Sequence, residues 1–246
     1  MLGIVTVAYQ EEARLTKTLN SLTLLDASVE HIVVIPEGDQ LSMSTLHNFL
    51  GRSNRNTKVV MDSMRGIYAA MNLGIRASES THLMFLNAGD EILSRESFEQ
   101  FEKQLSTCES VWGICDAEFE WQVTNVQSLR ELMNFLCQES GYFLSHQTVA
   151  FQKESLIRVG GYNERFLVAG DTELILEFSR IGSPCFFRRK TIRVEKPNFA
   201  AKRNRKGRSE IFWILVFKGV SGQKILSIFR FLRQEASTVV RKYYAK

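Results

Sequence analysis

The sequence predicts an α/β fold with a mostly parallel, doubly wound sheet flanked by helices. Short apolar runs rich in Val and Ile alternate with longer segments in which apolar residues recur every three or four positions. Strands that alternate with helices pair in parallel, because each helix returns the chain to the same end of the sheet. With 246 residues, 44% of them hydrophobic, the chain is long enough to build one large core.

The first half of the chain supplies four predicted strands and three predicted helices. Residues 31–35 are continuously apolar after their histidine, which is typical of a parallel strand buried on both faces. The apolar residues of segment 67–75 follow the i, i+3, i+4, i+7, i+8 spacing of a single helix face. The predicted strands are 2–8, 31–35, 58–61 and 81–86, and the predicted helices are 11–25, 42–50 and 67–75.

The second half follows the same rules with weaker patterns. Ser94 is suited to cap a helix, since its hydroxyl accepts a hydrogen bond from a free backbone N–H group of the first turn. Gly160 and Gly161 end one predicted helix, and Gly182 ends the next. The predicted strands are 111–121, 148–151 and 186–194, and the predicted helices are 95–106, 127–137, 154–159 and 172–182.

Charge is distributed unevenly along the chain. Residues 186–246 contain 17 Lys and Arg against 3 Asp and Glu, a balance of +14, whereas residues 1–185 have a balance of −10. A polar, basic stretch near 196–207 predicts the boundary between a domain at residues 1–195 and a basic helical extension at residues 196–246. An acidic domain with a basic extension predicts an anionic partner for the extension.

In the extension, basic residues stand among aromatic and aliphatic ones. A helix of this composition suits an anionic membrane surface, contacted through residues 201–246. Its apolar runs are shorter than the roughly 18 residues that a membrane span needs. The alternative is that the same helices pack on the domain or on a partner subunit. Nucleic acid is not predicted as a partner, because the sequence has no nucleic-acid-binding motif.

The start of the chain and the cysteines predict a cytoplasmic protein. The apolar run 1–9 lacks a basic leader and is followed by Glu11 and Glu12, so a signal peptide is not expected. If the extension binds lipid, the protein is peripheral on the inner face of the plasma membrane. The four cysteines lack metal-ligand spacing and are expected as reduced thiols: Cys108, Cys115, Cys137 and Cys185.

The ends of the first four predicted strands are candidate ligand loops. In an open α/β sheet, ligands bind outside the carboxyl ends of the strands. The loops at 6–9, 36–39, 62–66 and 87–90 are therefore expected to converge on one site. Each of them carries polar side chains or glycine.

Two of these loops suit a nucleotide. Tyr9 is placed to stack on a base, with backbone groups of residues 6–8 at the edge of that base. Arg65 and Gly66 begin a helix, where free N–H groups and a cation both favour phosphate. The structural alternatives are a Tyr9 ring that packs at the strand end and a solvated Arg65.

The turn 87–90 ends the fourth predicted strand in Asn-Ala-Gly-Asp. Asp90 is suited to hold a divalent metal, Mg²⁺ or Mn²⁺, that bridges two phosphates. Magnesium takes one or two carboxylates, and phosphate and water complete its shell. The alternative is a turn aspartate that precedes the next helix.

Three later polar residues are candidates for contact with the acceptor molecule of a group-transfer reaction. Asp171 precedes a predicted helix, and a carboxylate in hydrogen-bonding reach takes the proton of a hydroxyl as the hydroxyl attacks. Helix N-cap is the structural alternative for Asp171, because Asp favours that position. His146 and Gln147 stand before a predicted strand and suit contact with an acceptor or diphosphate, with a structural histidine as the alternative.

Taken in order, these segments resemble the family-2 glycosyltransferases with the GT-A (Rossmann-like) fold. The resemblance is carried by Gly66-Ile-Tyr-Ala-Ala-Met-Asn72 and Phe85-Leu-Asn-Ala-Gly-Asp90. Residues 4–11 resemble the first strand of the family, and 146–151, 161–166 and 169–173 resemble its acceptor-side half. The resemblance covers residues 2–182, and it is especially to bacterial members that assemble colanic acid and other surface polysaccharides.

The resemblance implies a role for each candidate residue. Asp171 would be the catalytic base, and Asp90 would be the ligand of a divalent metal, Mg²⁺ or Mn²⁺. His146 and Gln147 would contact the acceptor. The residues expected to bind the nucleotide sugar are Thr6, Ala8, Tyr9, Asp39, Asp62, Arg65, Gly66, Asn72 and Asn87.

The sequence therefore predicts an inverting glycosyltransferase that moves a sugar from a nucleotide-diphosphate sugar to a glycan or lipid-linked acceptor in surface polysaccharide biosynthesis. Met64, Ala69 and Gly89 stand where the family commonly carries acids. These differences keep open a non-catalytic nucleotide-sugar-binding or assembly protein. A sugar nucleotidyltransferase of the same fold is the other alternative, although residues 9–13 are not the Gly-rich loop that such enzymes usually carry.

Overall fold

The computed structural model describes residues 1–119, 124–125, 142–195, 209–211, 213–214 and 217. The predicted helix 127–137, Cys137 and most of the extension lie outside these residues. The strands are β1 (Leu2–Val7), β2 (His31–Pro36), β3 (Thr57–Asp62), β4 (His82–Asn87), β5 (Glu91–Ile92), β6 (Trp112–Phe119), β7 (Thr124–Asn125), β8 (Tyr142–Phe143), β9 (Val149–Gln152) and β10 (Cys185–Val194).

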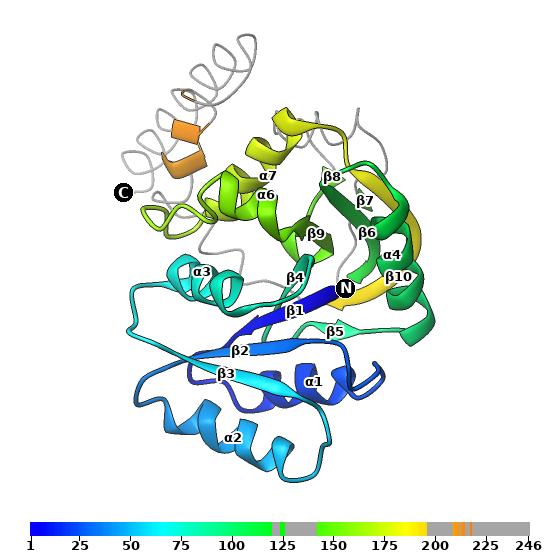
Figure 1. Cartoon of the computed structure of the whole chain (residues 1–246). Coiled ribbons are helices and arrows are strands. Elements are labelled where there is room, and N and C mark those ends of the chain that lie inside the picture. The colour runs from blue at the N-terminus through cyan, green and yellow to red at the C-terminus, as the bar shows by residue number, and fades with distance from the viewer. Residues whose placement is uncertain (120–123, 126–141, 196–208, 212, 215–216, 218–246) are drawn as a thin grey trace, which may run out of the picture.

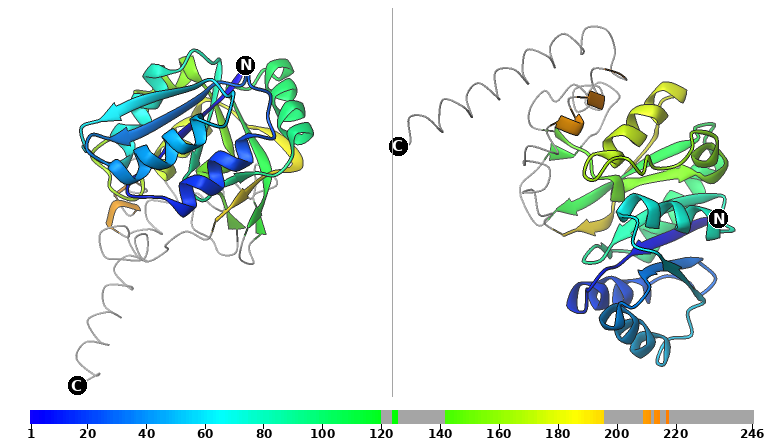
Figure 2. Two further views of the ribbon diagram at one scale, coloured as in Figure 1. Left: turned by 90° about the horizontal axis from the view of Figure 1, so that it is seen from below. Right: turned by 90° about the vertical axis from the view of Figure 1, so that its left-hand side faces the viewer.

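An eight-stranded sheet forms the centre of the molecule, with the order β3-β2-β1-β4-β9-β6-β10-β5 (Figure 1). Helices cover both faces, so the chain builds the three layers of the predicted α/β fold (Figure 2). The helices are α1 (Ala13–Leu22), α2 (Gln40–Leu50), α3 (Ile67–Ala77), α4 (Arg95–Thr107), α6 (Lys153–Arg158) and α7 (Gly170–Ile181), and η1 (His146–Thr148) is a 3₁₀ turn.

The first half of the sheet is parallel, as predicted. β1 pairs in parallel with β2 on one side and with β4 on the other, and β2 pairs in parallel with β3. The connecting helices α1, α2 and α3 return the chain to the same end of the sheet each time. All four strands therefore end at one edge, where their loops meet.

Side chains of the central strands alternate between two cores. Val5 and Phe85 pack with residues of α3, α6 and α7 on one face. Ile4 and Met84 pack with residues of α1 and α4 on the other face. All four side chains are at most 1% exposed. Burial on both faces explains why these strands are continuously apolar in sequence.

The second half of the sheet is mixed in direction. β9 is antiparallel to both of its neighbours, β4 and β6, whereas β10 is parallel to β6 and antiparallel to β5. The predicted strands at 111–121, 148–151 and 186–194 are present as β6, β9 and β10. Ser94 caps α4 as predicted, since its hydroxyl accepts the Ser97 N–H at 3.2 Å.

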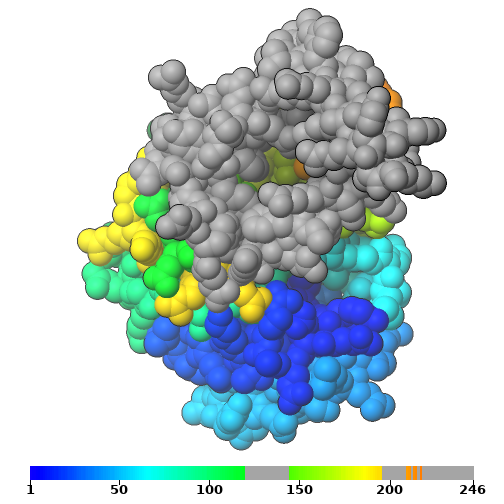
Figure 3. All heavy atoms as spheres, turned by 180° about the vertical axis from the view of Figure 1, so that it is seen from behind, coloured from blue at the N-terminus to red at the C-terminus, as the bar shows by residue number. Residues whose placement is uncertain are grey.

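Figure 3 shows the face behind the view of Figure 1, where the N-terminal strand–helix units form one end of the molecule.

Among the residues that the structure describes, no helix combines the length and apolar character that a membrane crossing requires. Cys108, Cys115 and Cys185 are free thiols.

Helix α3 lies close to β1 because Gly74 faces Val5. A Cβ atom placed on Gly74 would lie 2.3 Å from Val5 Cγ1, well inside van der Waals contact. The absence of a side chain at this position thus allows the helix backbone to pack directly on the central strand.

Gly74→Ala is expected to lower the free energy of unfolding by about 1–3 kcal/mol, the usual cost of overpacking a core. This loss should appear although alanine favours a helix interior by about 1 kcal/mol over glycine. Urea unfolding measures the change. Gly182→Ala is the matched control, because Gly182 has an extended φ of 171° and open space where its Cβ would lie. Equal losses at the two positions would contradict the close approach of α3 and β1.

Candidate active site

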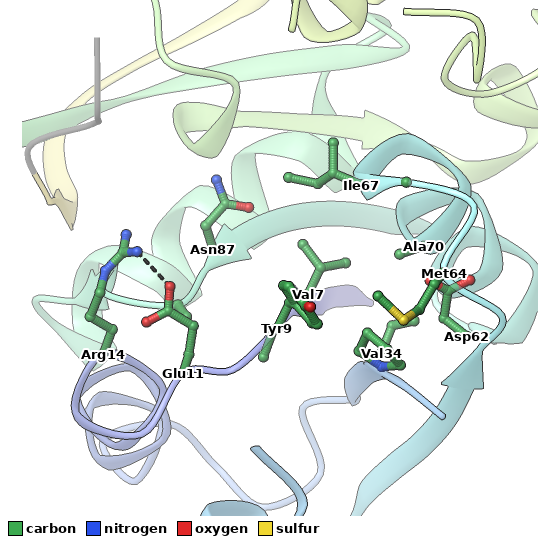
Figure 4. Close-up of a pocket in the computed structure, with 14 residues that line it drawn as sticks. Val7, Tyr9, Glu11, Arg14, Val34, Asp62, Met64, Ile67, Ala70 and Asn87 are labelled. Carbon is green, nitrogen blue, oxygen red and sulfur yellow. Dashed lines mark hydrogen bonds and ion pairs between the residues drawn. The ribbon is translucent and has the colours of Figure 1, made fainter. Parts of the chain in front are cut away.

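A cavity of about 550 Å³ opens at the carboxyl ends of β1, β2, β3 and β4 (Figure 4). Its lining comes from all four strand ends, so the loops predicted to converge do converge. The cavity lies where the chain, after adding β2 and β3 on one side of β1, crosses to add β4 on the other, which is the usual ligand position in such sheets. The lining residues are Val7, Ala8, Tyr9, Glu11, Arg14, Val34, Pro36, Asp62, Met64, Gly66, Ile67, Ala70, Asn87 and Ala88.

Apolar walls and a few polar groups make up the cavity. Figure 4 shows Asp62 at one end, Arg14 with Glu11 at the other, and Tyr9 between them. The Tyr9 side chain is 51% exposed, so its ring is available to a ligand. A mainly apolar cavity with a few placed polar groups is the usual form of a small-molecule site.

Two polar atoms at this cavity have no hydrogen-bond partner among the described residues. They are Asp62 Oδ1 and Asn87 Oδ1, and both are buried. A buried acceptor left unpaired costs about 1–3 kcal/mol. A ligand that donates hydrogen bonds to these oxygens would remove that cost.

The backbone at the mouth of the cavity is strained. Gln10 has a φ of 52° and Met64 a φ of 60°, and they are the non-glycine residues with positive φ among those that the structure describes. Gly66, with a φ of 112°, follows closely as the N-cap of α3. Side-chain-bearing residues adopt this conformation at a cost, and such residues cluster at ligand sites.

Arg14 is a cation of the cavity that the sequence analysis did not identify. Its guanidinium donates to Glu195 Oε2 at 2.5 Å and to Glu11 Oε1 at 2.7 Å. The spacing of Glu11 and Arg14, three residues apart, was a signal for a local charge pair. Their approach to Glu195 depends on the tertiary fold, which brings the end of β10 beside α1.

Asp90 lies next to the cavity and is 2% exposed. Its Oδ2 accepts the Asn87 N–H and its Oδ1 accepts the Glu195 N–H, each at 3.0 Å. Burial raises the pKa of the Asp90 carboxyl to about 6, although the Glu195 N–H, the Gln147 side chain and His146 each lower it. The carboxylate is therefore incompletely compensated, and a bound cation would stabilise its charged form.

Asp171 contacts His146 beyond the turn that carries Asp90. His146 Nδ1 lies 3.5 Å from Asp171 Oδ2, and each of the two side chains is 10% exposed. The His146 Nε2 atom is buried without a hydrogen-bond partner among the described residues. The turn η1 supplies both His146 and Gln147, which places the predicted base and acceptor-side pair in one cluster with Asp90.

Asp171 is not the N-cap of α7, so the structural alternative for this residue is wrong in that form. The N-cap is Ala169, and Asp171 is the second residue of the helix. Asp171 Oδ1 accepts the Thr172 N–H at 2.7 Å. The Tyr68 ring lies against Gly170, since a Cβ atom placed on Gly170 would lie 2.8 Å from Tyr68 Cε2.

Two buried tyrosines stand beside Asp171. The rings of Tyr68 and Tyr162 stack with centroids 5.5 Å apart. Burial, followed by the charge of Asp171, raises the pKa of both phenols well above the ordinary value. Both phenols therefore stay protonated at neutral pH.

The side chains of Thr6 and Asp39 make hydrogen bonds within the fold, and neither residue is in the cavity lining. The Thr6 hydroxyl is buried 3.1 Å from His31 Nε2, on the side of β1 away from the cavity lining. Asp39 caps α2, accepting the Ser42 N–H at 3.2 Å and the Gln10 N–H at 2.7 Å. The Asp39 carboxylate thus supports the strained loop that carries Tyr9, rather than lining the cavity.

Asn72 and Arg65 also lie outside the cavity lining. Asn72 Nδ2 donates to the Tyr162 carbonyl at 2.8 Å and to Glu164 Oε1 at 3.0 Å, and Asn72 Oδ1 accepts the Tyr162 N–H at 2.8 Å. These bonds hold the loop after Gly161 on α3 and leave Asn72 outside the cavity lining. The Arg65 side chain is 58% exposed and lies 3.9 Å from Glu164. Of the nine predicted donor-binding residues, Ala8, Tyr9, Asp62, Gly66 and Asn87 line the cavity.

The family model described as glycosyl transferase family 2 matches residues 3–164. The chain belongs to this family. It is therefore a glycosyltransferase, and its sheet has the GT-A arrangement. No curated protein sequence matches the chain.

Solved glycosyltransferase structures share the fold. S. aureus TarS superposes with a TM-score of 0.68 at 15% identity, covering 94% of this chain and 42% of that chain. TarS 1-349 in complex with UDP superposes with a TM-score of 0.67 at 14% identity, covering 96% and 72%. The mannosyltransferase PcManGT from Pyrobaculum calidifontis, in complex with GDP-Man and Mn²⁺, superposes with a TM-score of 0.63 at 16% identity, covering 93% and 64%. This glycosyltransferase thus spans less than half the length of the longer of these two TarS chains.

Asp90→Asn is expected to change how stability depends on pH. The folded-state pKa of Asp90 is raised to about 6, so between about pH 4 and pH 6 the folded chain holds a proton that the unfolded chain releases. Stability contributed by Asp90 is present at low pH and is lost as pH rises through this window. The unfolding free energy of the variant, minus that of the parent, should therefore rise from pH 4 to pH 7 by up to about 3 kcal/mol.

Urea unfolding at each pH in metal-free buffer measures this difference. Glu154→Gln, at an exposed position in the first turn of α6, is the control for loss of a surface carboxylate. A flat difference for Asp90→Asn would contradict the raised pKa.

Proposed function

We propose that this glycosyltransferase is an inverting enzyme that moves a sugar from a nucleotide-diphosphate sugar to a glycan or lipid-linked acceptor in surface polysaccharide biosynthesis. The observation that carries the proposal is a continuous line of contacts from the cavity to Asp171. Asn87 lines the cavity and donates its N–H to Asp90, Asp90 interacts with Gln147 and His146, and His146 contacts Asp171. This line supports a donor in the cavity and a general base at Asp171.

The cavity suits a nucleotide sugar. Tyr9 offers a ring on which a base can stack. Asp62 Oδ1, which has no partner among the described residues, can accept a hydrogen bond from a hydroxyl group of a ribose or a sugar. Gly66 begins α3, so the free N–H groups of the first turn favour phosphate. The fold neighbours support this choice of ligand, since TarS structures contain UDP or UDP-GlcNAc and the PcManGT structure contains GDP-Man.

Asp90 and the amide oxygen of Asn87 would hold a divalent metal, Mg²⁺ or Mn²⁺. The fit rests on the unpartnered Asn87 Oδ1 atom and on the buried, incompletely compensated Asp90 carboxylate. Within the described ranges, no three His, Cys, Asp or Glu side chains are grouped around one point. One carboxylate is nevertheless sufficient for magnesium when phosphate and water complete the shell. Bound there, the metal would stabilise the negative charge on the departing diphosphate.

Asp171 acts as the general base of the transfer. Its carboxylate takes the proton of the acceptor hydroxyl as that oxygen forms a bond to the anomeric carbon. The bond from the anomeric carbon to the diphosphate breaks in the same step, so the configuration inverts. General-base catalysis of this kind contributes roughly 10²–10⁴-fold to the rate.

His146 supports this base. Its Nδ1 atom lies 3.5 Å from Asp171 Oδ2, where it orients the carboxylate. Its unpartnered Nε2 atom is left to contact the acceptor or the diphosphate. Gln147 interacts with Asp90 and so connects the acceptor side to the diphosphate side.

The extension suits contact with a membrane that contains lipid-linked acceptor. Trp213 and Phe217 stack with ring centroids 5.2 Å apart, and they are 49% and 70% exposed. The sequence around them is strongly basic, with a balance of +14 over residues 186–246. Exposed aromatic rings beside basic residues favour an anionic interface. This supports a cytoplasmic enzyme that is peripheral on the inner face of the plasma membrane.

The donor reaction is tested with a panel of uridine and guanosine diphosphate sugars, with and without Mn²⁺. At least one donor is expected to be hydrolysed in the presence of the protein and the metal, with release of its nucleoside diphosphate. Asp171→Asn should lower this rate by about 10²–10⁴-fold without loss of donor affinity. Nucleotide release and calorimetric binding measure the two quantities.

Glu177→Gln, on the same helix as Asp171 and paired with Arg180 near the surface, is the matched control and should retain the parent rate. Donor binding with no turnover of any donor would favour the non-catalytic interpretation. An unchanged rate in a folded Asp171→Asn variant would reject Asp171 as the base.

Membrane contact is tested by flotation with vesicles of phosphatidylserine and phosphatidylcholine. Trp213→Ser combined with Phe217→Ser should weaken binding by about tenfold or more, since burying one aromatic side chain contributes about 1.5–3 kcal/mol. Ile157→Ser, at an equally exposed apolar position on α6, is the control and should bind like the parent protein. Absence of the parent protein from floated anionic vesicles would reject the membrane contact.

A further inference from the structure

The Glu210 carboxylate accepts hydrogen bonds from three consecutive backbone N–H groups. Glu210 Oε1 accepts the Leu167 N–H at 3.0 Å, and Oε2 accepts those of Val168 at 2.9 Å and Ala169 at 3.0 Å. These residues precede Glu210 by 41 to 43 positions in the chain. The contact therefore joins the C-terminal segment to the loop that enters α7.

Helix α7 begins with an N-cap that has no side chain suited to the role. Ala169 is the N-cap, and no side-chain cap bond is formed there. Glu210 supplies a carboxylate just before this end, and the Asp171 side chain accepts the Thr172 N–H. A negative charge at a helix N-terminus is also favoured by the helix dipole.

The segment that carries Glu210 is anchored in the main core. Ile214 is 2% exposed and belongs to the core cluster that includes residues of α3 and α7. Ile211 packs against the same cluster. The two isoleucines thus hold Glu210 in place, while Trp213 and Phe217 are exposed.

We propose that Glu210 is a positioning residue for Asp171 and that it couples the C-terminal segment to the transfer reaction. This inference rests on the proposed role of Asp171 as the base. Asp171 is two residues from the last N–H that Glu210 holds, and it must stay within reach of His146. Without the carboxylate, three N–H groups exchange a protein acceptor for water, and the first turn of α7 loses its support.

Substitution of Glu210 should lower kcat and leave the affinity for the donor unchanged. The cavity lining comes from the ends of β1 to β4 and the first turns of α1 and α3, away from the loop that Glu210 holds. A variant of Glu210 therefore leaves the donor site intact and displaces the base. A purely structural role would instead lower donor affinity and thermal stability together.

The test compares Glu210→Ala and Glu210→Gln in the full-length protein. Glu210→Ala is expected to lower kcat about tenfold, the effect of losing a good helix cap on a correctly placed group. Glu210→Gln keeps one acceptor oxygen and should recover part of that loss. The donor dissociation constant should stay within about twofold of the parent value in both variants, and amide hydrogen exchange at residues 167–169 should accelerate.

Glu154→Gln removes an exposed carboxylate from the first turn of α6 and is the matched control, with parent kcat and parent exchange. If the parent protein transfers sugar and Glu210→Ala matches its kcat, the positioning role is overturned. A loss of donor affinity equal to the loss of kcat also overturns it. If the parent transfers no sugar, the proposed function fails, and the exchange measurement then decides separately whether Glu210 holds the loop.

Discussion

The parallel pairing of β1 with both β2 and β4 is the constraint on which the rest of the structure depends. β1 is buried on both faces, and its neighbours run in the same direction. The connecting helices must therefore return to one edge, and the four strand ends must meet at the other. The cavity, the Asn87–Asp90 turn and the contact to His146 are all placed by this arrangement. The close approach of α3 at Gly74 completes it, because at this position no side chain separates the helix from β1.

The candidate site also contains features that are unfavourable in a protein core. Four buried polar atoms have no partner within the part of the chain that the structure describes: Asp62 Oδ1, Asn87 Oδ1, His146 Nε2 and the Tyr162 hydroxyl. The Asp90 carboxyl is buried and titrates well above its ordinary range. Two residues at the cavity mouth hold positive φ. A folded protein accepts such costs where a ligand or a proton transfer makes use of them.

The TarS and PcManGT structures share the fold of this chain at 14% to 16% identity. In this chain one carboxylate, Asp90, stands in the turn after β4. The electrostatics next to this turn depend on the buried Asp90 carboxylate, which accepts the Glu195 N–H, and on Arg14, which pairs with Glu11 and Glu195.

By itself, the sequence determined the order of strands and helices, the cap at Ser94, the convergence of four loops and the group of candidates around Asp90 and Asp171. Each of these follows from local periodicity, from local backbone chemistry or from the rule that parallel strands end together. The tertiary structure alone decided the antiparallel direction of β9, since an apolar run carries no direction. It also decided that the side chains of Thr6, Asp39 and Asn72 bond within the fold, that Arg14 lines the cavity with Glu195 beside it, and that Glu210 bonds to the loop before α7. Those partners lie far apart in sequence, and a polar side chain does not reveal which distant backbone group or charge it will meet.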